Sequence, residues 1–186
     1  MKRAIILLFA LFLCGSSLAA QNKKPAPSKN APQTNKPLMV SDYFLLLPKP
    51  YINLTPQARK LLLNAPSGVT IDNQDGYLNF NESPTSQSVI VLFKKPDGSN
   101  LIGLTRTKAS AAKKSGEDGD EECELYVLSY DGKQFVEVTK ETIPMAVNKK
   151  YYYDLSRKGT FVRVENGDGD LVYSFIWDNG KFTLKR

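Results

Sequence analysis

Apolar and polar residues alternate in short runs along most of the chain after residue 67, and the runs are separated by tight turns. Residues 89–93 are apolar without a break, which is typical of a strand covered on both faces. The expected hairpin turns are Asp75-Gly76, Pro96-Asp97-Gly98, Asp131-Gly132 and Asn179-Gly180. Such turns between strand-like runs connect antiparallel neighbours. The pattern predicts a mainly β fold of about eight to ten strands, built as a meander or sandwich or as a curved sheet.

One short helix is predicted before the strands. Thr55 is a suitable N-cap, and Pro56 fits the first helical position. Apolar residues follow at Ala58, Leu61 and Leu62, which gives a stripe with helical spacing. A helix this short is marginal alone, so we expect it to dock on a sheet.

A strand near the end of the chain has apolar residues at alternate positions. These are Leu171, Tyr173, Phe175 and Trp177. Alternate residues of a strand lie on the same face of a sheet. We therefore expect all four side chains to belong to the core.

The first 20 residues have the pattern of a secretory signal peptide. Lys2 and Arg3 precede the apolar run 4–13, and small residues follow at 17–20. This predicts a signal peptide at 1–20 and a periplasmic or secreted protein. The alternative is a lipoprotein anchored through Cys14, the one case in which we expect membrane contact, although the bulky Leu13 precedes that cysteine.

The segment 21–38 is rich in Pro, Asn and Lys and has few apolar residues, so it predicts a flexible tether. The rest, 39–186, is expected to be a single β-rich domain. Six of the 25 basic residues lie before residue 39, so this domain has 19 basic and 19 acidic residues. A neutral domain lacks the basic surface typical of nucleic-acid binders, and we expect no nucleic-acid partner.

The polar run 108–122 ends in an acidic stretch and predicts a solvated loop. Cys123 follows it and is the only cysteine outside the predicted signal peptide. The neighbouring Glu121, Glu122 and Glu124 disfavour a thiolate, so Cys123 is expected to be an idle thiol or to pair between chains.

The sequence contains no histidine, which excludes several catalytic mechanisms. Hydrolases with a histidine base and metal sites built on imidazole both require that residue. No glycine-rich phosphate loop precedes a helix, and no cofactor is expected. A carboxylate-dependent polysaccharide hydrolase remains an alternative, because the chain has 19 acidic residues.

One spacing resembles part of a calcium loop. Asn166, Asp168 and Asp170 match the first three alternating oxygen ligands. Leu171 stands where the loop needs glycine, and Trp177 where it needs the bidentate glutamate. The favoured interpretation is a plain turn without metal.

The strongest binding candidates are Tyr151, Tyr152 and Tyr153. In a strand, Tyr151 and Tyr153 lie on one face and Tyr152 on the other, so at least one ring is expected near solvent. Exposed tyrosines suit contact with glycans or proteins. The alternative is that the rings pack at a sheet edge and bind nothing.

Several segments together resemble uncharacterised exported bacterial β-rich proteins of the domain-of-unknown-function type. They are residues 42–48, the turn at 96–98, residues 135–139 with Ile143-Pro144, residues 155–160, and residues 177–182. The resemblance implies no catalytic residue and no ligand. The expected function is an exported, non-catalytic binding or interaction module of the bacterial envelope, with an envelope protein or glycan as partner.

Overall fold

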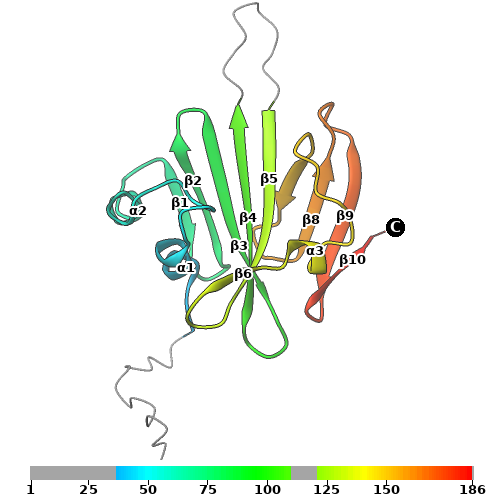
Figure 1. The fold of residues 1–186 in the computed structure, drawn as a ribbon, viewed down its shortest axis with the longest axis horizontal. Helices are drawn as coiled ribbons and strands as arrows, with labels where there is room; N and C mark the ends of the chain where they lie inside the picture. The colour runs from blue at the N-terminus through cyan, green and yellow to red at the C-terminus, as the bar shows by residue number, and fades with distance from the viewer. Residues whose placement is uncertain (1–36, 110–120, 186) are drawn as a thin grey trace, which may run out of the picture. The chain divides into compact units, whose positions relative to one another are not determined.

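The computed structural model describes residues 37–109 and 121–185, and these residues form two antiparallel sheets and three helices (Figure 1). The first sheet contains, in order, β1 (Val69–Asp72), β2 (Tyr77–Ser83), β3 (Ser86–Lys94), β4 (Asn100–Ala109), β5 (Glu121–Tyr130) and β6 (Phe135–Glu137). The second contains β7 (Tyr152–Leu155), β8 (Phe161–Glu165), β9 (Leu171–Asp178) and β10 (Lys181–Leu184). The helices are α1 (Val40–Leu46), α2 (Pro56–Leu63) and α3 (Thr139–Thr142). The predicted mainly β fold is confirmed.

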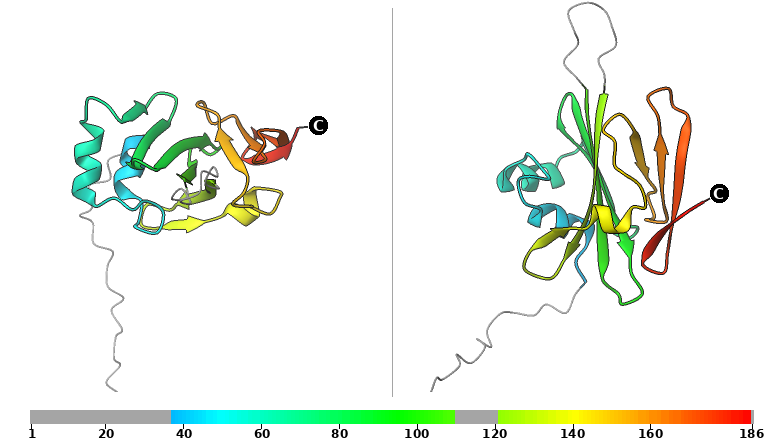
Figure 2. Two further views of the ribbon diagram at one scale, coloured as in Figure 1. Left: turned by 90° about the horizontal axis from the view of Figure 1, so that it is seen from above. Right: turned by 45° about the vertical axis from the view of Figure 1, so that its right-hand side comes forward.

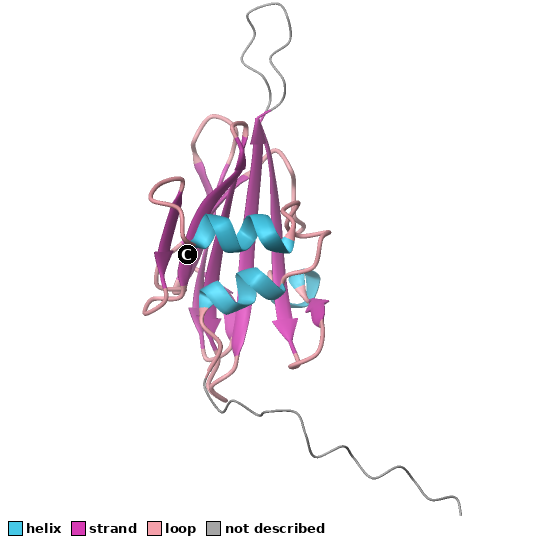
Figure 3. Ribbon diagram, turned by 90° about the vertical axis from the view of Figure 1, so that its left-hand side faces the viewer, coloured by secondary structure: helices cyan, strands magenta, loops and turns pink. Residues whose placement is uncertain are grey.

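The six-stranded sheet is the middle layer of three. Helices α1 and α2 cross its strands on one face, and the four-stranded sheet covers part of the other (Figures 2 and 3). Strand β3 shows why both faces need a cover. Its Ile90 and Leu92 lie in the core beneath the helices, whereas Val91 and Phe93 lie in the core between the sheets. The prediction of a strand covered on both faces is thus confirmed.

The four predicted hairpin turns all occur. They connect β1 to β2, β3 to β4, β5 to β6 and β9 to β10. The predicted loop 108–122 is shorter at both ends, because β4 extends to Ala109 and β5 begins at Glu121. Its middle lies outside the described residues. So do the predicted signal peptide, Cys14 and the tether up to residue 36.

The prediction of one short helix was incomplete. Helix α2 forms as expected, and the Thr55 hydroxyl accepts a hydrogen bond from the Ala58 amide at 3.2 Å. Helix α1 was missed because Met39 precedes it, where sequence reasoning looks for Ser, Thr, Asp or Asn. The Asp42 carboxylate instead accepts a hydrogen bond from the Met39 amide at 2.8 Å.

A buried arginine connects the two N-terminal helices. Arg59, on α2, is only 3% exposed. Its guanidinium donates hydrogen bonds to the main-chain carbonyls of Phe44, Leu45, Leu47, Ile52 and Leu54. Several of these carbonyls lie at the C-terminal end of α1, where a helix leaves carbonyls unpaired and favours a cation.

The turn between β7 and β8 lies close against strand β3 of the other sheet. Gly159 in this turn has φ +62°, and a Cβ atom there would lie 2.2 Å from the Leu92 carbonyl oxygen of β3. Trp177 strengthens the contact nearby, since its indole nitrogen donates to the Lys94 carbonyl at 2.8 Å. A residue with a side chain therefore does not fit at position 159.

Two glycine substitutions distinguish the loss of stability caused by this close contact from the loss caused by backbone strain alone. Gly98 also has positive φ, but its Cβ position is open. We expect Gly98→Ala to cost about 1 kcal/mol of unfolding free energy, the cost of a left-handed alanine. Gly159→Ala should cost at least about 3 kcal/mol, because a main-chain clash is added. Urea unfolding measures both, and equal losses would contradict the close contact.

Candidate functional site

A β-bulge changes the exposed surface of the four-stranded sheet. Val164 of β8 pairs with Tyr173, but the next residue, Glu165, pairs with Leu171, so β9 has one extra residue there. Leu171 therefore lies on the outer face, opposite to Tyr173 and Phe175, and is 54% exposed.

The prediction that all four alternate residues of β9 are core was wrong for two of them. Phe175 is buried, and Trp177 packs against Phe93 and Phe182. Tyr173 keeps the inner orientation, but it is 38% exposed and stacks on Phe175. Leu171 is turned away by the bulge, which the sequence pattern does not reveal.

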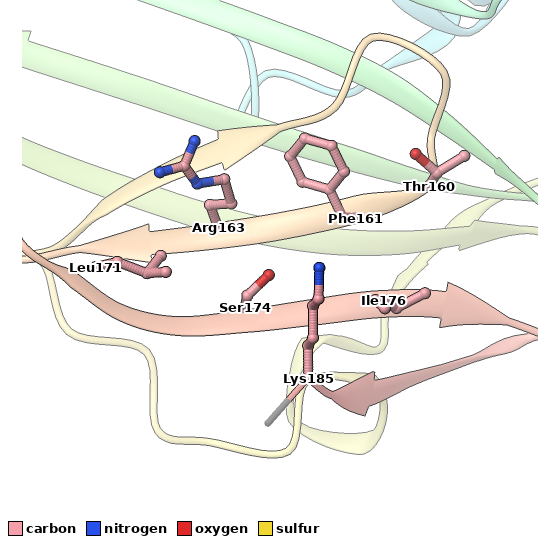
Figure 4. A pocket seen from close by; sticks show the side chains of 7 residues that line it. All are labelled: Thr160, Phe161, Arg163, Leu171, Ser174, Ile176 and Lys185. Carbon is pink, nitrogen blue, oxygen red and sulfur yellow. The ribbon is translucent and has the colours of Figure 1, made fainter.

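The outer face of the four-stranded sheet has a hollow of about 540 Å³ (Figure 4). Its apolar lining comes from Phe161 on β8 and from Leu171 and Ile176 on β9. Its polar lining comes from Thr160, Arg163, Ser174 and Lys185. In the close view, the side chains of Arg163 and Lys185 stand on either side of Ser174.

Strand pairing aligns these side chains in two rows across the sheet. Ser174 pairs with Arg163, and the Lys185 amide donates to the Ser174 carbonyl at 2.7 Å, so a polar row crosses β8, β9 and the end of β10. Phe161 pairs with Ile176 and forms an apolar row beside it. Two strand spacings separate the Arg163 and Lys185 backbones, which is about 10 Å. Long side chains from these positions reach a common point above Ser174.

The charges of this face are not evenly balanced. Arg163 forms an ion pair with Glu165 at 3.2 Å, and Asp154 is its cross-strand neighbour on β7. Within the described part of the chain, Lys185 forms no ion pair. The positive charge is therefore least compensated at the end of the row formed by Ser174 and Lys185.

The described lining of the hollow combines a hydroxyl, an apolar floor and a cationic rim. Ser174 provides a hydroxyl, but among the described residues no carboxylate lines the hollow to act as its base. The apolar floor, formed by Phe161, Leu171 and Ile176, and the cations Arg163 and Lys185 at its rim together favour ligands that have an apolar group and an anionic group. None of these residues was identified from the sequence, because strand register brings them together.

The three predicted tyrosines lie on different faces. Tyr153 is buried in the core between the sheets, and Tyr151 packs against that core. Tyr152 pairs with Glu165 and so lies on the outer face, half-buried and outside the lining of the hollow. The Tyr153 hydroxyl donates to the Asn148 carbonyl at 2.9 Å and accepts from the Asn148 amide at 2.7 Å. Tyr153 thus holds the segment before β7 in place.

The calcium-like residues lie in the turn between β8 and β9. The Asn166 side-chain oxygen accepts hydrogen bonds from the amides of Asp168 and Asp170, at 3.0 and 2.8 Å. Its side-chain nitrogen donates to the Asp170 carboxylate at 3.3 Å. These contacts are those of an Asx-type turn. Among the described residues, no group of three or more His, Cys, Asp or Glu is arranged to hold a metal.

A second hollow, of about 450 Å³, has two carboxylates in its lining. Glu124 and Glu137 line it together with Tyr126 and the segment 145–147. Burial raises the pKa of Glu124, but the hydrogen bond and ion pair with Arg106, helped by Lys108, outweigh it, so the pKa is lowered overall. A general acid of a glycosidase needs a raised pKa. Glu124 is shifted in the opposite direction.

Cys123 lies in the core between the sheets and is 2% exposed. Burial raises the pKa of its thiol, against the hydrogen bond from the Thr107 hydroxyl. A buried thiol with a raised pKa is a poor nucleophile.

Comparisons with known proteins add little to this geometry. No protein-family model and no curated protein matches the chain. Among solved structures, it is similar to a domain of an uncharacterized protein from Porphyromonas gingivalis W83. The TM-score is 0.44 and the identity 12%, over 78% of this chain and 97% of that chain. In the described residues, no helix is both long and apolar enough to cross a membrane.

The hydroxyl of Tyr153 should contribute to stability, unlike that of Tyr152. We expect Tyr153→Phe to lower the unfolding free energy by about 1–2 kcal/mol, because the main-chain groups of Asn148 lose their partner. Tyr152→Phe should change it by less than about 0.5 kcal/mol, since it removes a hydroxyl from the outer face. Urea unfolding of both variants checks this, and equal effects would contradict the assigned role.

The Glu124 carboxylate should make stability depend on acidity. The pKa of Glu124 is lowered in the folded protein, so the carboxylate adds to the free energy of unfolding at pH values above the ordinary Glu pKa of about 4.3. This contribution is lost as the pH falls through the pKa of the folded state. We expect Glu124→Gln to cost about 2 kcal/mol near neutral pH and much less near about pH 3. The exposed Glu122, in Glu122→Gln, is the matched control. Urea unfolding at both pH values tests this, and a constant difference would contradict it.

Proposed function

We propose that this protein is an exported, non-catalytic binding module of the bacterial envelope, and that it contacts its ligand through the outer face of the four-stranded sheet. The observation that supports the proposal is the hollow on that face, with exposed Leu171 and Ile176 beside Arg163 and Lys185. Apolar side chains exposed together on a small domain are typical of a contact surface.

Export is proposed from the sequence pattern of residues 1–20, which precede the described part of the chain. A non-catalytic role is supported by the lining of the hollow, to which the described residues contribute one serine and two cations but no carboxylate or histidine. The alternative of a carboxylate-dependent hydrolase gains no support from Glu124, whose pKa is lowered.

Photo-crosslinking in the producing cells tests whether the outer face binds a ligand. In one variant a photoreactive phenylalanine analogue replaces Ile176 on this face. In the control variant it replaces Gln57, an exposed residue of α2, which lies on the opposite side of the molecule. We expect an adduct at position 176 at least about fivefold above that at 57, since a bound ligand is held against the first position only.

Mass spectrometry of the purified adduct then gives the size of the crosslinked molecule. Both variants should unfold at the same urea concentration as the wild type, which controls for damage to the fold. Equal crosslinking at the two positions, or none at 176, would contradict the proposed contact face.

A further inference from the structure

The outer face combines an apolar floor with one cation, Lys185, that forms no ion pair with a carboxylate of the described residues. This combination indicates the chemical class of the ligand. From this geometry we propose that the hollow binds a small amphipathic carboxylate, with its anionic group at Lys185 and Ser174 and its apolar group over Phe161 and Ile176. The inference rests on the proposed function of this face and adds the chemical class of the ligand.

The position of the anionic group follows from the charges around the hollow. Among the described residues, Glu165 on β8 forms an ion pair with Arg163, and Asp154 on β7 is the cross-strand neighbour of Arg163. Lys185 stands at the opposite end of the row, next to the Ser174 hydroxyl. An anion placed there gains a charge-assisted hydrogen bond from the ammonium and a neutral one from the hydroxyl.

The position of the apolar group follows from strand register. Ile176 is two residues beyond Ser174 on β9, and Phe161 pairs with it across the sheet. Residues two apart on a strand are about 7 Å apart, which is the length of a short alkyl chain or a phenyl group. A ligand with its carboxylate above Ser174 therefore places such a group on the Phe161 and Ile176 side chains.

The lining also excludes other ligand classes. A cationic head group would meet Lys185, which no described carboxylate neutralises. A neutral alcohol would contact the same floor, but it would lack the charge-assisted bond. Among ligands of the same chain length, we therefore expect the affinity for this site to depend on the charge of the head group.

NMR titrations test this ranking. The mature protein is titrated with octanoate, octanol and octylammonium, and the chemical shifts of its amides are measured. We expect octanoate to bind about tenfold more tightly than octanol, because one charge-assisted hydrogen bond is added. Octylammonium should bind more weakly than octanol. The shifted amides should belong to β8, β9 and β10.

Three variants and one control assign the head-group contacts. Lys185→Gln should weaken octanoate binding about tenfold and leave octanol binding unchanged. Ser174→Ala should weaken it about threefold, and Glu165→Gln should strengthen it about threefold by releasing Arg163. Lys181→Gln, at the start of β10 and outside the lining of the hollow, should change nothing.

The results separate this inference from the function on which it rests. Equal affinities for octanoate and octanol, or equal effects of Lys185→Gln and Lys181→Gln, would overturn the anionic ligand class. The anionic ligand class would also be overturned if octanoate did not bind and the adduct at position 176 contained a protein. The outer face would then remain a contact surface. Absence of both would overturn the two proposals together.

Discussion

The need to cover both faces of the six-stranded sheet determines the arrangement of the whole domain. Strand β3 alternates buried apolar side chains on its two faces, so neither face can be left in water. Helices α1 and α2 cover one face, and the four-stranded sheet covers part of the other. The second sheet then has its own outer face toward solvent, and the candidate site lies there.

Local sequence signals were sufficient to predict much of the fold. Turn residues such as Asn179-Gly180 fix a backbone conformation by themselves, and Thr55-Pro56 marks a helix start through contacts within one turn. These signals need no distant partner, which is why the hairpins and α2 were predicted. Helix α1 was missed because the Asp42 carboxylate supplies its N-terminal hydrogen bond from inside the helix.

The candidate site depends on contacts that no local signal encodes. Arg163 and Lys185 come near Ser174 only through the register of β8, β9 and the end of β10. The bulge opposite Glu165 then brings Leu171 to the same face, against the alternation of the strand. The tyrosines at 151–153 do have a sequence signal, but the burial of Tyr153 is decided by the core between the two sheets, which residues distant in the sequence form.

The arginine between the two N-terminal helices has a consequence for the stability of the domain in acid. Burial lowers the pKa of the Arg59 guanidinium, with an opposing effect from Glu82, but arginine keeps its proton throughout the physiological range. Its acceptors are main-chain carbonyls, which do not titrate. Acid that protonates carboxylates elsewhere therefore leaves this connection unchanged, and the helical layer is joined by bonds that do not respond to the acidity of the surroundings.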